Sequence, residues 1–411
     1  MINKVKLTLT ALLFSGVLVA QEKNDTITTT RKSIPASFYF SNGIGMVAPD
    51  SLFSMNFRFR TQLRSAYTTV SENDFTASEI EARVRRFRLR MEGFVINSKI
   101  NYYLQLSFSR GDMDWTDNDN SAINSSPNIV RDAVFIYKPT NKLSIIFGQT
   151  KLPGNRQRVV SSGELQFADR SIVNSTFTTD RDFGLQFAYL NNVSKIHYAL
   201  KGAVSSGEGR NSTVSDGGLA YTGRAELLPF GKFTNKGDYF EGDLEREQKP
   251  KVSIAAGYHY NERARRTAGT LGKDLYESRN LSVFISDMLI KYRGFALSAE
   301  YINRTTDNAF TTNSLKEQRH VYIGEGKMAQ ISYLFKNNLE IAARYARISP
   351  FASIQKKELQ REEMGLGVTK YLKKHRVKLQ GHVFYNQSTN LFLDEITTKN
   401  WNTTFQIEIG I

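Results

Sequence analysis

The stretch FSMNFRFRTQLR, residues 53–64, alternates apolar and polar side chains with a period of two. The apolar members share one parity: Phe53, Met55, Phe57, Phe59 and Leu63. The polar members share the other parity: Ser54, Asn56, Arg58, Arg60, Gln62 and Arg64. Side chains two residues apart point to the same face of a β-strand, whereas a helix would mix the two sets. The stretch therefore predicts a strand with one apolar face and one face that carries guanidinium groups.

The same alternation returns along most of the chain. In RFRLRME, residues 86–92, Phe87, Leu89 and Met91 alternate with arginines. We find sixteen segments of this kind, at 52–67, 82–97, 99–110, 129–139, 141–149, 182–190, 194–204, 219–228, 251–262, 280–291, 293–304, 325–336, 338–349, 361–372, 375–387 and 400–411. A soluble antiparallel sheet is the alternative. An even number of segments favours a bacterial membrane barrel whose two termini lie in the periplasm.

The lengths of the connections favour the same barrel. Short links, at 139–142, 191–194, 292–294, 336–338 and 373–374, alternate with long polar loops. Short periplasmic turns and long external loops are typical of outer-membrane barrels. The link 229–250 is long on the short-turn side, and the sequence predicts no role for it. The last segment, WNTTFQIEIGI (401–411), has an apolar face that runs to the final residue, which suits closure against the first strand.

The N-terminus predicts export. Lys4 and Lys6 precede an apolar stretch at 7–20, and the polar residues QEKND follow it, which is the layout of a cleaved signal peptide. The apolar stretch is shorter than the roughly 20 residues that a spanning helix needs. We therefore predict three parts: a signal peptide at 1–20, an extended or disordered leader at 21–50, and a barrel at 51–411 in the outer membrane of a Gram-negative bacterium.

Composition narrows the classes of function. The formal net charge is +15, the mean hydropathy is −0.40 and there is no cysteine. A helical membrane protein, disulfides and thiolate metal sites are thereby excluded. Basic chains bind nucleic acid, lipid head groups or anionic solutes, and export makes nucleic acid the least expected partner. The chain has five histidines, His197, His259, His320, His375 and His382, and they are scattered without catalytic or metal-ligand spacing. We therefore expect no enzyme activity, no catalytic residues, no metal and no cofactor.

The link 150–181 is the longest external connection between adjacent predicted strands. It contains apolar residues that a solvated loop does not need: Val159, Val160, Leu165, Phe167, Ile172, Val173 and Phe177. A surface loop with scattered apolar residues is the alternative. We predict that this third external loop folds into the lumen and packs on the inner wall of the barrel.

The same loop carries a family resemblance. Gly148, Gln149, Lys151 and Pro153 end a strand, the pair Arg170-Ser171 follows, and Arg181, Asp182 and Gly184 begin the next strand. With the arginine-rich segment 86–92, this run resembles the phosphate-selective porin O/P family. The resemblance implies an all-β, transmembrane antiparallel barrel of about sixteen strands that forms a homotrimer. It also implies that Arg and Lys line a constriction at the third loop.

The basic residues on the inward parity and in this loop are the candidate binding residues. They are Arg58, Arg60, Arg64, Arg86, Arg88, Arg90, Lys151, Arg156, Arg158 and Arg170. Arginine stays charged at any relevant pH and binds oxyanions through two parallel N–H donors. We predict passive diffusion of small anions, with phosphate and polyphosphate as candidates, through a pore lined by these residues.

Three alternatives remain open at this point: a general porin, a sugar-selective porin and a structural barrel with a blocked lumen. Sugar pores have aromatic tracks, whereas the inward parity here carries mainly Arg, Gln, Ser and Glu. The expected partners are small anions such as phosphate and outer-membrane lipid. The final strand also resembles the C-terminal signal that the barrel-insertion machinery recognises, although it ends in Ile in place of the more frequent Phe.

Overall fold

The computed structural model describes residues 36–40, 43–49, 51–109, 129–213 and 215–411. The predicted signal peptide, 1–20, lies outside these residues. The described chain from Ala36 to Ile411 belongs to one compact unit. Its structure is almost all-β, and none of its described helices is long and apolar enough to span a membrane.

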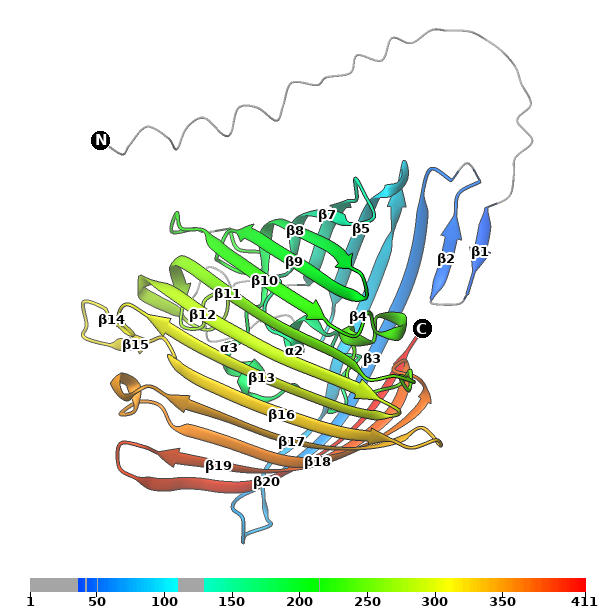
Figure 1. The fold of residues 1–411 in the computed structure, drawn as a ribbon. Coiled ribbons are helices and arrows are strands. Elements are labelled where there is room, and N and C mark those ends of the chain that lie inside the picture. Colours follow the sequence, from blue (N-terminus) through cyan, green and yellow to red (C-terminus); the bar gives the residue numbers. More distant parts are fainter. Residues whose placement is uncertain (1–35, 41–42, 50, 110–128, 214) are drawn as a thin grey trace, which may run out of the picture. The chain divides into compact units, whose positions relative to one another are not determined.

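Sixteen of the described strands form a closed antiparallel barrel (Figure 1). They are β3 (Ser54–Thr69), β4 (Ala77–Val95), β5 (Asn97–Ser107), β6 (Val130–Tyr137), β7 (Leu143–Lys151), β8 (Arg181–Val193), β9 (Ile196–Ser205), β10 (Ala220–Leu228), β11 (Lys251–Arg266), β12 (Asp274–Tyr292), β13 (Phe295–Thr306), β16 (Gly324–Leu334), β17 (Leu339–Pro350), β18 (Gln360–Lys373), β19 (Val377–Asn390) and β20 (Glu395–Gly410). The ring closes where β20 pairs with β3, from Asn402 opposite Thr68 to Gly410 opposite Arg60. The predicted closure by the last strand is confirmed.

Each of the sixteen predicted segments corresponds to one strand of the barrel. The main difference lies at the ends that precede or follow long loops. Strands β4, β12 and β20 begin at Ala77, Asp274 and Glu395, whereas the sequence predicted starts at 82, 280 and 400. A strand that projects beyond the membrane has water on both faces, so its sequence loses the alternation on which the prediction depended.

The two ends of the barrel differ in their connections. At one end, which we call the short-turn end, links such as Tyr292 to Phe295 contain two residues, Arg293 and Gly294, both with positive φ. Such a turn matches the right-handed twist of the two strands that it joins. The C-terminus lies at this end (Figure 1). Short turns mark the periplasmic side of outer-membrane barrels, so the opposite, long-loop end faces outward.

Smaller elements lie in the N-terminal segment and in the connections between strands. Strands β1 (Ser37–Tyr39) and β2 (Ile44–Val47) fall in the range expected as a leader, and β2 pairs with the start of β3, beyond the point where β20 ends. The remaining elements are α2 (Arg156–Val159), α3 (Ile172–Phe177), the 3-10 turns η1 (Thr234–Tyr239) and η2 (Ala352–Ile354), and the hairpin of β14 (Phe310–Thr312) with β15 (Gln318–His320).

The barrel wall has an apolar outside and a polar inside. Outward residues such as Phe147, Leu366 and Phe405 are exposed, whereas inward residues such as Gln62 and Gln406 are fully buried. A soluble sheet would bury its apolar face, so this distribution excludes the soluble alternative. The polar interior is where a functional site must be sought.

Candidate functional site

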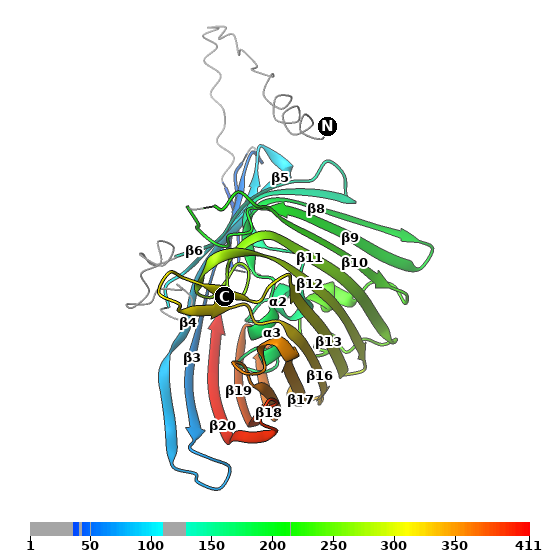
Figure 2. The same ribbon diagram turned by 90° about the vertical axis from the view of Figure 1, so that its left-hand side faces the viewer.

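The connection between β7 and β8, residues 152–180, lies inside the barrel, and we call it the inner loop. Figure 2 looks toward the ring of strands and shows α2 and α3 of this loop within it. Five of the seven apolar side chains named in the sequence are buried: Val160, Leu165, Phe167, Val173 and Phe177. The prediction that this loop folds into the lumen is confirmed.

One side of the lumen is filled by an apolar core. Helix α3 contacts β13, β16 and β17, and its Val173 and Phe177 are fully buried there. Wall residues such as Ile302 and Ile348 and the external-loop residue Val321 belong to the same cluster. Because apolar side chains occupy this half, a polar route through the barrel is confined to the other half, along β3 to β8.

Arg156 anchors the inner loop to the filled half of the wall. Its guanidinium donates to Asp287 at 2.5 Å through Nε and to Ser253 at 2.7 Å through Nη2. Arg224 binds the other oxygen of Asp287 at 2.7 Å. Asn155 adds a hydrogen bond of 3.0 Å to Glu300. Arg156 is therefore a buried tether, and it does not line the polar route.

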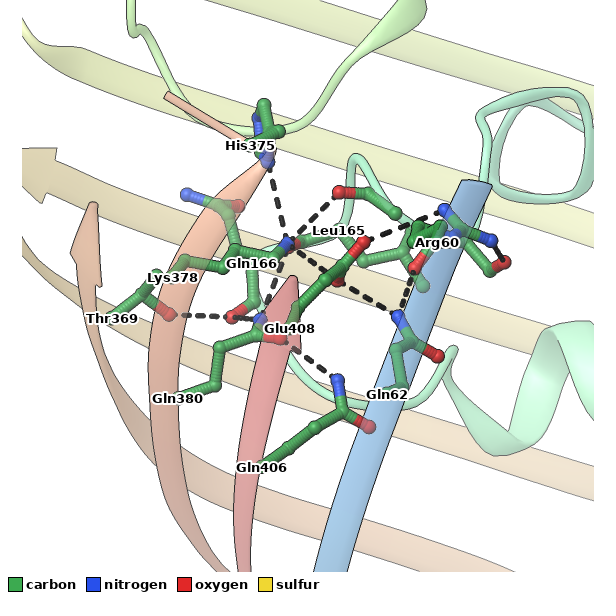
Figure 3. A network of polar contacts seen from close by, with 12 residues as sticks. Arg60, Gln62, Leu165, Gln166, Thr369, His375, Lys378, Gln380, Gln406 and Glu408 are labelled. Carbon is green, nitrogen blue, oxygen red and sulfur yellow. Dashed lines mark hydrogen bonds and ion pairs between the residues drawn. The ribbon is translucent and has the colours of Figure 1, made fainter. Parts of the chain in front are cut away.

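The middle of the inner loop is held by its main chain (Figure 3). Lys378 Nζ donates to the carbonyl of Leu165 at 2.6 Å, and Gln380 donates to that of Gln166 at 2.7 Å. Glu408, fully buried on β20, accepts from Gln62 at 2.8 Å. Gln62 also donates to the carbonyl of Ser162 at 3.1 Å, so the loop is joined to β19 and to β3.

The link 229–250 enters the lumen from the short-turn end and meets the inner loop. The main-chain N–H of Glu241 donates to the carbonyl of Glu164 at 2.9 Å. The carboxylate of Glu241 accepts from the N–H of Gln166 at 2.8 Å. On the wall side, Lys291 Nζ donates to the carbonyl of Phe240 at 2.7 Å. This insert, whose role the sequence did not predict, contacts the inner loop from the side of the short-turn end and supports it there.

A cavity of about 390 Å³ lies between the inner loop and the strands β3 to β8. We call it the basic cavity, because eight cationic side chains line it among the described residues: Arg58, Arg88, Arg90, Arg131, Lys151, Arg158, Arg170 and Arg181. The carboxylates of its lining are Asp132 and Glu164, and Tyr239 of the insert also reaches it. A second cavity of about 110 Å³, the C-terminal cavity, is lined by Arg60, Glu408 and Ile411.

The ten candidate residues are distributed over four places. Six of them line the basic cavity: Arg58, Arg88, Arg90, Lys151, Arg158 and Arg170. Arg60 lines the C-terminal cavity and donates to Ser162 of the inner loop at 2.7 Å. Arg64 and Arg86 lie 2.6 Å and 3.8 Å from the carboxylate of Asp169 in the inner loop. Arg156 is the buried tether on the opposite wall.

Two inward arginines, Arg85 and Arg131, were missed because each lies at a β-bulge. The register shift between Gln62 and Leu63 leaves Arg85 without an opposite residue on β3, and a similar shift between Gln105 and Leu106 of β5 places Arg131 in a bulge of β6. A bulge can turn two successive side chains to one face. Arg85 accordingly approaches Asp169 at 3.6 Å, and Arg131 lines the basic cavity. Simple parity assigns both to the outside.

The charges around the basic cavity are only partly matched. Arg181 binds Asp132 through two hydrogen bonds of 2.9 and 3.0 Å. Burial opposes ionisation of Asp180, yet Arg158 and Arg181 hold its pKa below the usual value. Lys151 and Arg170 instead donate to main-chain carbonyl groups, and neither forms an ion pair among the described residues. An excess of positive charge therefore faces the cavity.

Comparison with known structures supports the architecture. The outer membrane channel DcaP of Acinetobacter baumannii shares 12% identity with a TM-score of 0.53, over 87% of this chain and 97% of that chain. OmpF of Salmonella typhi, in complex with daunomycin, shares 13% identity with a TM-score of 0.52, over 88% and 99%. OprB of Pseudomonas putida shares 9% identity with a TM-score of 0.53, over 88% and 95%. At such identities the likeness shows the fold alone.

The sequence comparisons give the family. No curated protein sequence matches this chain. The sequence model of phosphate-selective porin O and P matches residues 56–341, which include the basic wall, the inner loop and the insert. Family and fold together indicate an outer-membrane channel. The resemblance read from the sequence is confirmed: the chain belongs to the phosphate-selective porin O and P family.

Proposed function

We propose that this channel conducts small anions, phosphate-like oxyanions among them, by passive diffusion through the basic cavity. The observation that carries the proposal is the lining of that cavity, where eight cationic side chains face two carboxylates among the described residues. Beside the lining, Glu92 pairs with Arg58 and Arg90, and Asp180 pairs with Arg158, so the cations still outnumber these carboxylates by eight to four. A passage lined by one sign of charge concentrates the opposite ions and repels ions of its own sign. Guanidinium groups also match the geometry of oxyanions, since they offer two parallel donors.

The two cavities follow one another along the proposed route toward the short-turn end. Arg58, Arg88 and Arg90 belong to the lining of both the basic cavity and the C-terminal cavity. The C-terminal cavity reaches Ile411, at the short-turn end. An anion that moves from one cavity to the next therefore keeps contact with the same guanidinium groups. Conduction requires several moderate sites in series, because one tight site would trap the ion.

Glu164 is a negative group within this route. It lines both cavities, and its main-chain carbonyl is held by the insert. Burial raises the pKa of Glu164, while Arg60, Lys151 and Arg90 favour its ionised form. In its ionised form the carboxylate weakens the attraction for anions locally. It thereby helps to keep the bound anion exchangeable.

Competition between ions tests the proposal. Single channels in a planar bilayer are bathed in chloride, and inorganic phosphate is added at increasing concentration. We expect phosphate to reduce the chloride current, because both ions use the same guanidinium sites. A current that phosphate leaves unchanged would favour a general porin, and a current reduced by neutral sugars would favour a sugar pore. The absence of any current would favour a blocked barrel.

The route of the protein to the membrane forms a second part of the proposal. Residues 1–20 are removed as a signal peptide, residues 21–50 form a leader, the final strand is recognised by the barrel-insertion machinery, and three barrels associate. The boundaries of the apolar stretch at 7–20 and the apolar face of 401–411 support these steps. N-terminal sequencing of the purified protein tests the first step, with Gln21 as the expected first residue. The mass of the detergent-extracted assembly tests the trimer.

A further inference from the structure

The short-turn end of the barrel carries a ring of exposed cations. Its turns present exposed basic side chains in each of seven connections: Lys99, Lys138 and Lys142, Lys195, Lys232, Lys236 and Lys249, Arg293, Lys336, and Lys373 and Lys374. The carboxylates among the described residues of these turns are buried or half-buried, and all of them lie in the insert. Asp243 and Glu247 are occupied by main-chain N–H groups at 2.7 Å and 2.6 Å. Glu245 accepts from Lys374 at 2.7 Å, and the exposed charges among the described residues of these turns are positive.

The long-loop end does not share this property. Exposed residues of both signs alternate there, as in Glu262 beside Arg263 and Lys316 beside Glu317. Solubility alone would not separate the two ends, because both meet water. The excess of positive charge at the short-turn end thus points to a negative partner that is met at that end.

An apolar side chain accompanies the lysine in most of these turns. Exposed pairs are Ile96 with Lys99, Tyr137 with Lys138, Val193 with Lys195, Phe230 with Lys232, Phe335 with Lys336, and Leu372 with Lys373. Ile96 lies between β4 and β5, and Val193 and Leu372 lie at the ends of β8 and β18. They are 65%, 67% and 59% exposed, which is unusual for aliphatic residues that face water. An aliphatic group at the acyl boundary and an ammonium group that extends to the head groups is the arrangement expected at a lipid interface.

We propose that this ring of lysines binds the head groups of anionic phospholipids in the leaflet that surrounds the short-turn end. A soluble anion would explain the lysines but not the apolar residues beside them. An anionic membrane surface explains both, since it attracts each nearby lysine and accepts the apolar side chain. The inference does not depend on which solute passes through the barrel.

Lipid binding by matched variants tests the proposal. The first variant is Lys138→Gln/Lys195→Gln/Lys336→Gln/Lys373→Gln at the short-turn end. The control is Lys273→Gln/Lys316→Gln/Lys356→Gln/Lys357→Gln at the long-loop end, which removes the same four charges from exposed positions. Native mass spectrometry of the detergent-purified barrel measures bound phosphatidylglycerol and phosphatidylcholine during a titration.

We expect the first variant to bind phosphatidylglycerol about fivefold more weakly at each site, which is the effect of one lysine near an anionic surface. The control should bind as the unmodified protein does, and phosphatidylcholine binding should not change in either variant. Equal binding of the two lipids, or an equal loss in both variants, would overturn the proposal. Displacement of the lipid by glycerol phosphate at the same concentration would also overturn it, because the site would then recognise a soluble phosphate. Anion selectivity is measured separately and can fail without affecting this result.

Discussion

The two faces of the inner loop have opposite charge arrangements. Toward the filled half of the lumen, Arg156 meets Asp287 and Arg344 meets Glu363 at 3.0 Å, so each of these two cations has a carboxylate beside it. Toward the basic cavity, Lys151 and Arg170 donate to carbonyl groups and keep their charge uncompensated. The difference teaches that matched pairs hold the loop in place, while unmatched cations on the other face create the field of the passage.

The same contrast separates stability from selectivity. Charge that is paired and buried contributes little to the potential of the cavity, but breaking the pair leaves a buried charge without compensation. Charge that faces an aqueous cavity contributes to the potential and is partly solvated. Substitutions on the two faces should therefore affect different measurements.

The largest effect should come from the matched face. Asp287→Ala removes the carboxylate that lies 2.5 Å from Arg156, and it leaves Arg224 with Glu226 alone. Loss of one partner of a buried ion pair costs about 3–5 kcal/mol. Denaturant unfolding of the purified barrel measures this loss. Glu325→Ala, which removes an exposed pair with Lys327, is the control and should cost at most about 1 kcal/mol. Equal stability of the two variants would mean that Asp287 does not anchor the loop.

The next effect should come from the unmatched face. Lys151→Gln/Arg170→Gln removes two charges from the basic cavity and keeps hydrogen-bond donors for the carbonyl groups. A unit charge about 8 Å from an ion contributes about 1 to 2 kcal/mol at an effective dielectric constant of about 20. We expect the anion-to-cation permeability ratio to fall about tenfold, with little change in stability. Lys316→Gln/Lys356→Gln on the external loops serves as control. An equal fall of the permeability ratio in the control would mean that the charges of the basic cavity do not determine selectivity.

Glu164→Gln should have a smaller effect of opposite sign. Burial raises the pKa of Glu164, so protonation begins at a higher pH than for an exposed glutamate. As the pH falls, the carboxylate loses its negative charge and the anion permeability ratio should rise, about two- to fivefold between about pH 8 and about pH 5. The variant should show the higher ratio at every pH. A pH dependence that persists in Glu164→Gln would assign it to another group.

The smallest effect should come from Arg85→Gln. Asp169 remains in contact with Arg64 at 2.6 Å and with Arg86 at 3.8 Å, and these guanidinium groups oppose the effect of burial and lower its pKa. We expect a loss of unfolding free energy of at most about 1 kcal/mol and a permeability ratio within about twofold of the original. A loss as large as that of Asp287→Ala would show that the bulge arginine, and not Arg64, holds the loop on this side.

The alternation of apolar and polar residues predicted which side chains point inward along most of the barrel wall, and it failed at bulges and in loops. Arg58, Arg88 and Arg90 could be placed on the inward face because β3 and β4 alternate regularly around them. Arg85 and Arg131 could not, since bulges interrupt the period of two and are not visible in the sequence. The facing of Arg156 was also not predictable, because a loop has no period and its orientation depends on distant partners such as Asp287.

The insert shows a second limit. Its length was evident from the sequence, but several of its contacts use main-chain groups, such as the hydrogen bond from the N–H of Glu241 to the carbonyl of Glu164. Nearly every residue has the same main-chain groups, so the pattern of side chains in the sequence does not predict such contacts. The apolar residues of the inner loop, in contrast, predicted correctly that the loop would be buried.

The reversal potential across a bilayer with a potassium chloride gradient tests the central claim most directly. The account predicts a potential of the sign expected for chloride permeation, which moves toward zero in Lys151→Gln/Arg170→Gln and is unchanged in Asp287→Glu, where the matched pair is conserved. A potential of the sign expected for potassium permeation in the unmodified channel would contradict the claim that the unmatched cations of the basic cavity govern what passes.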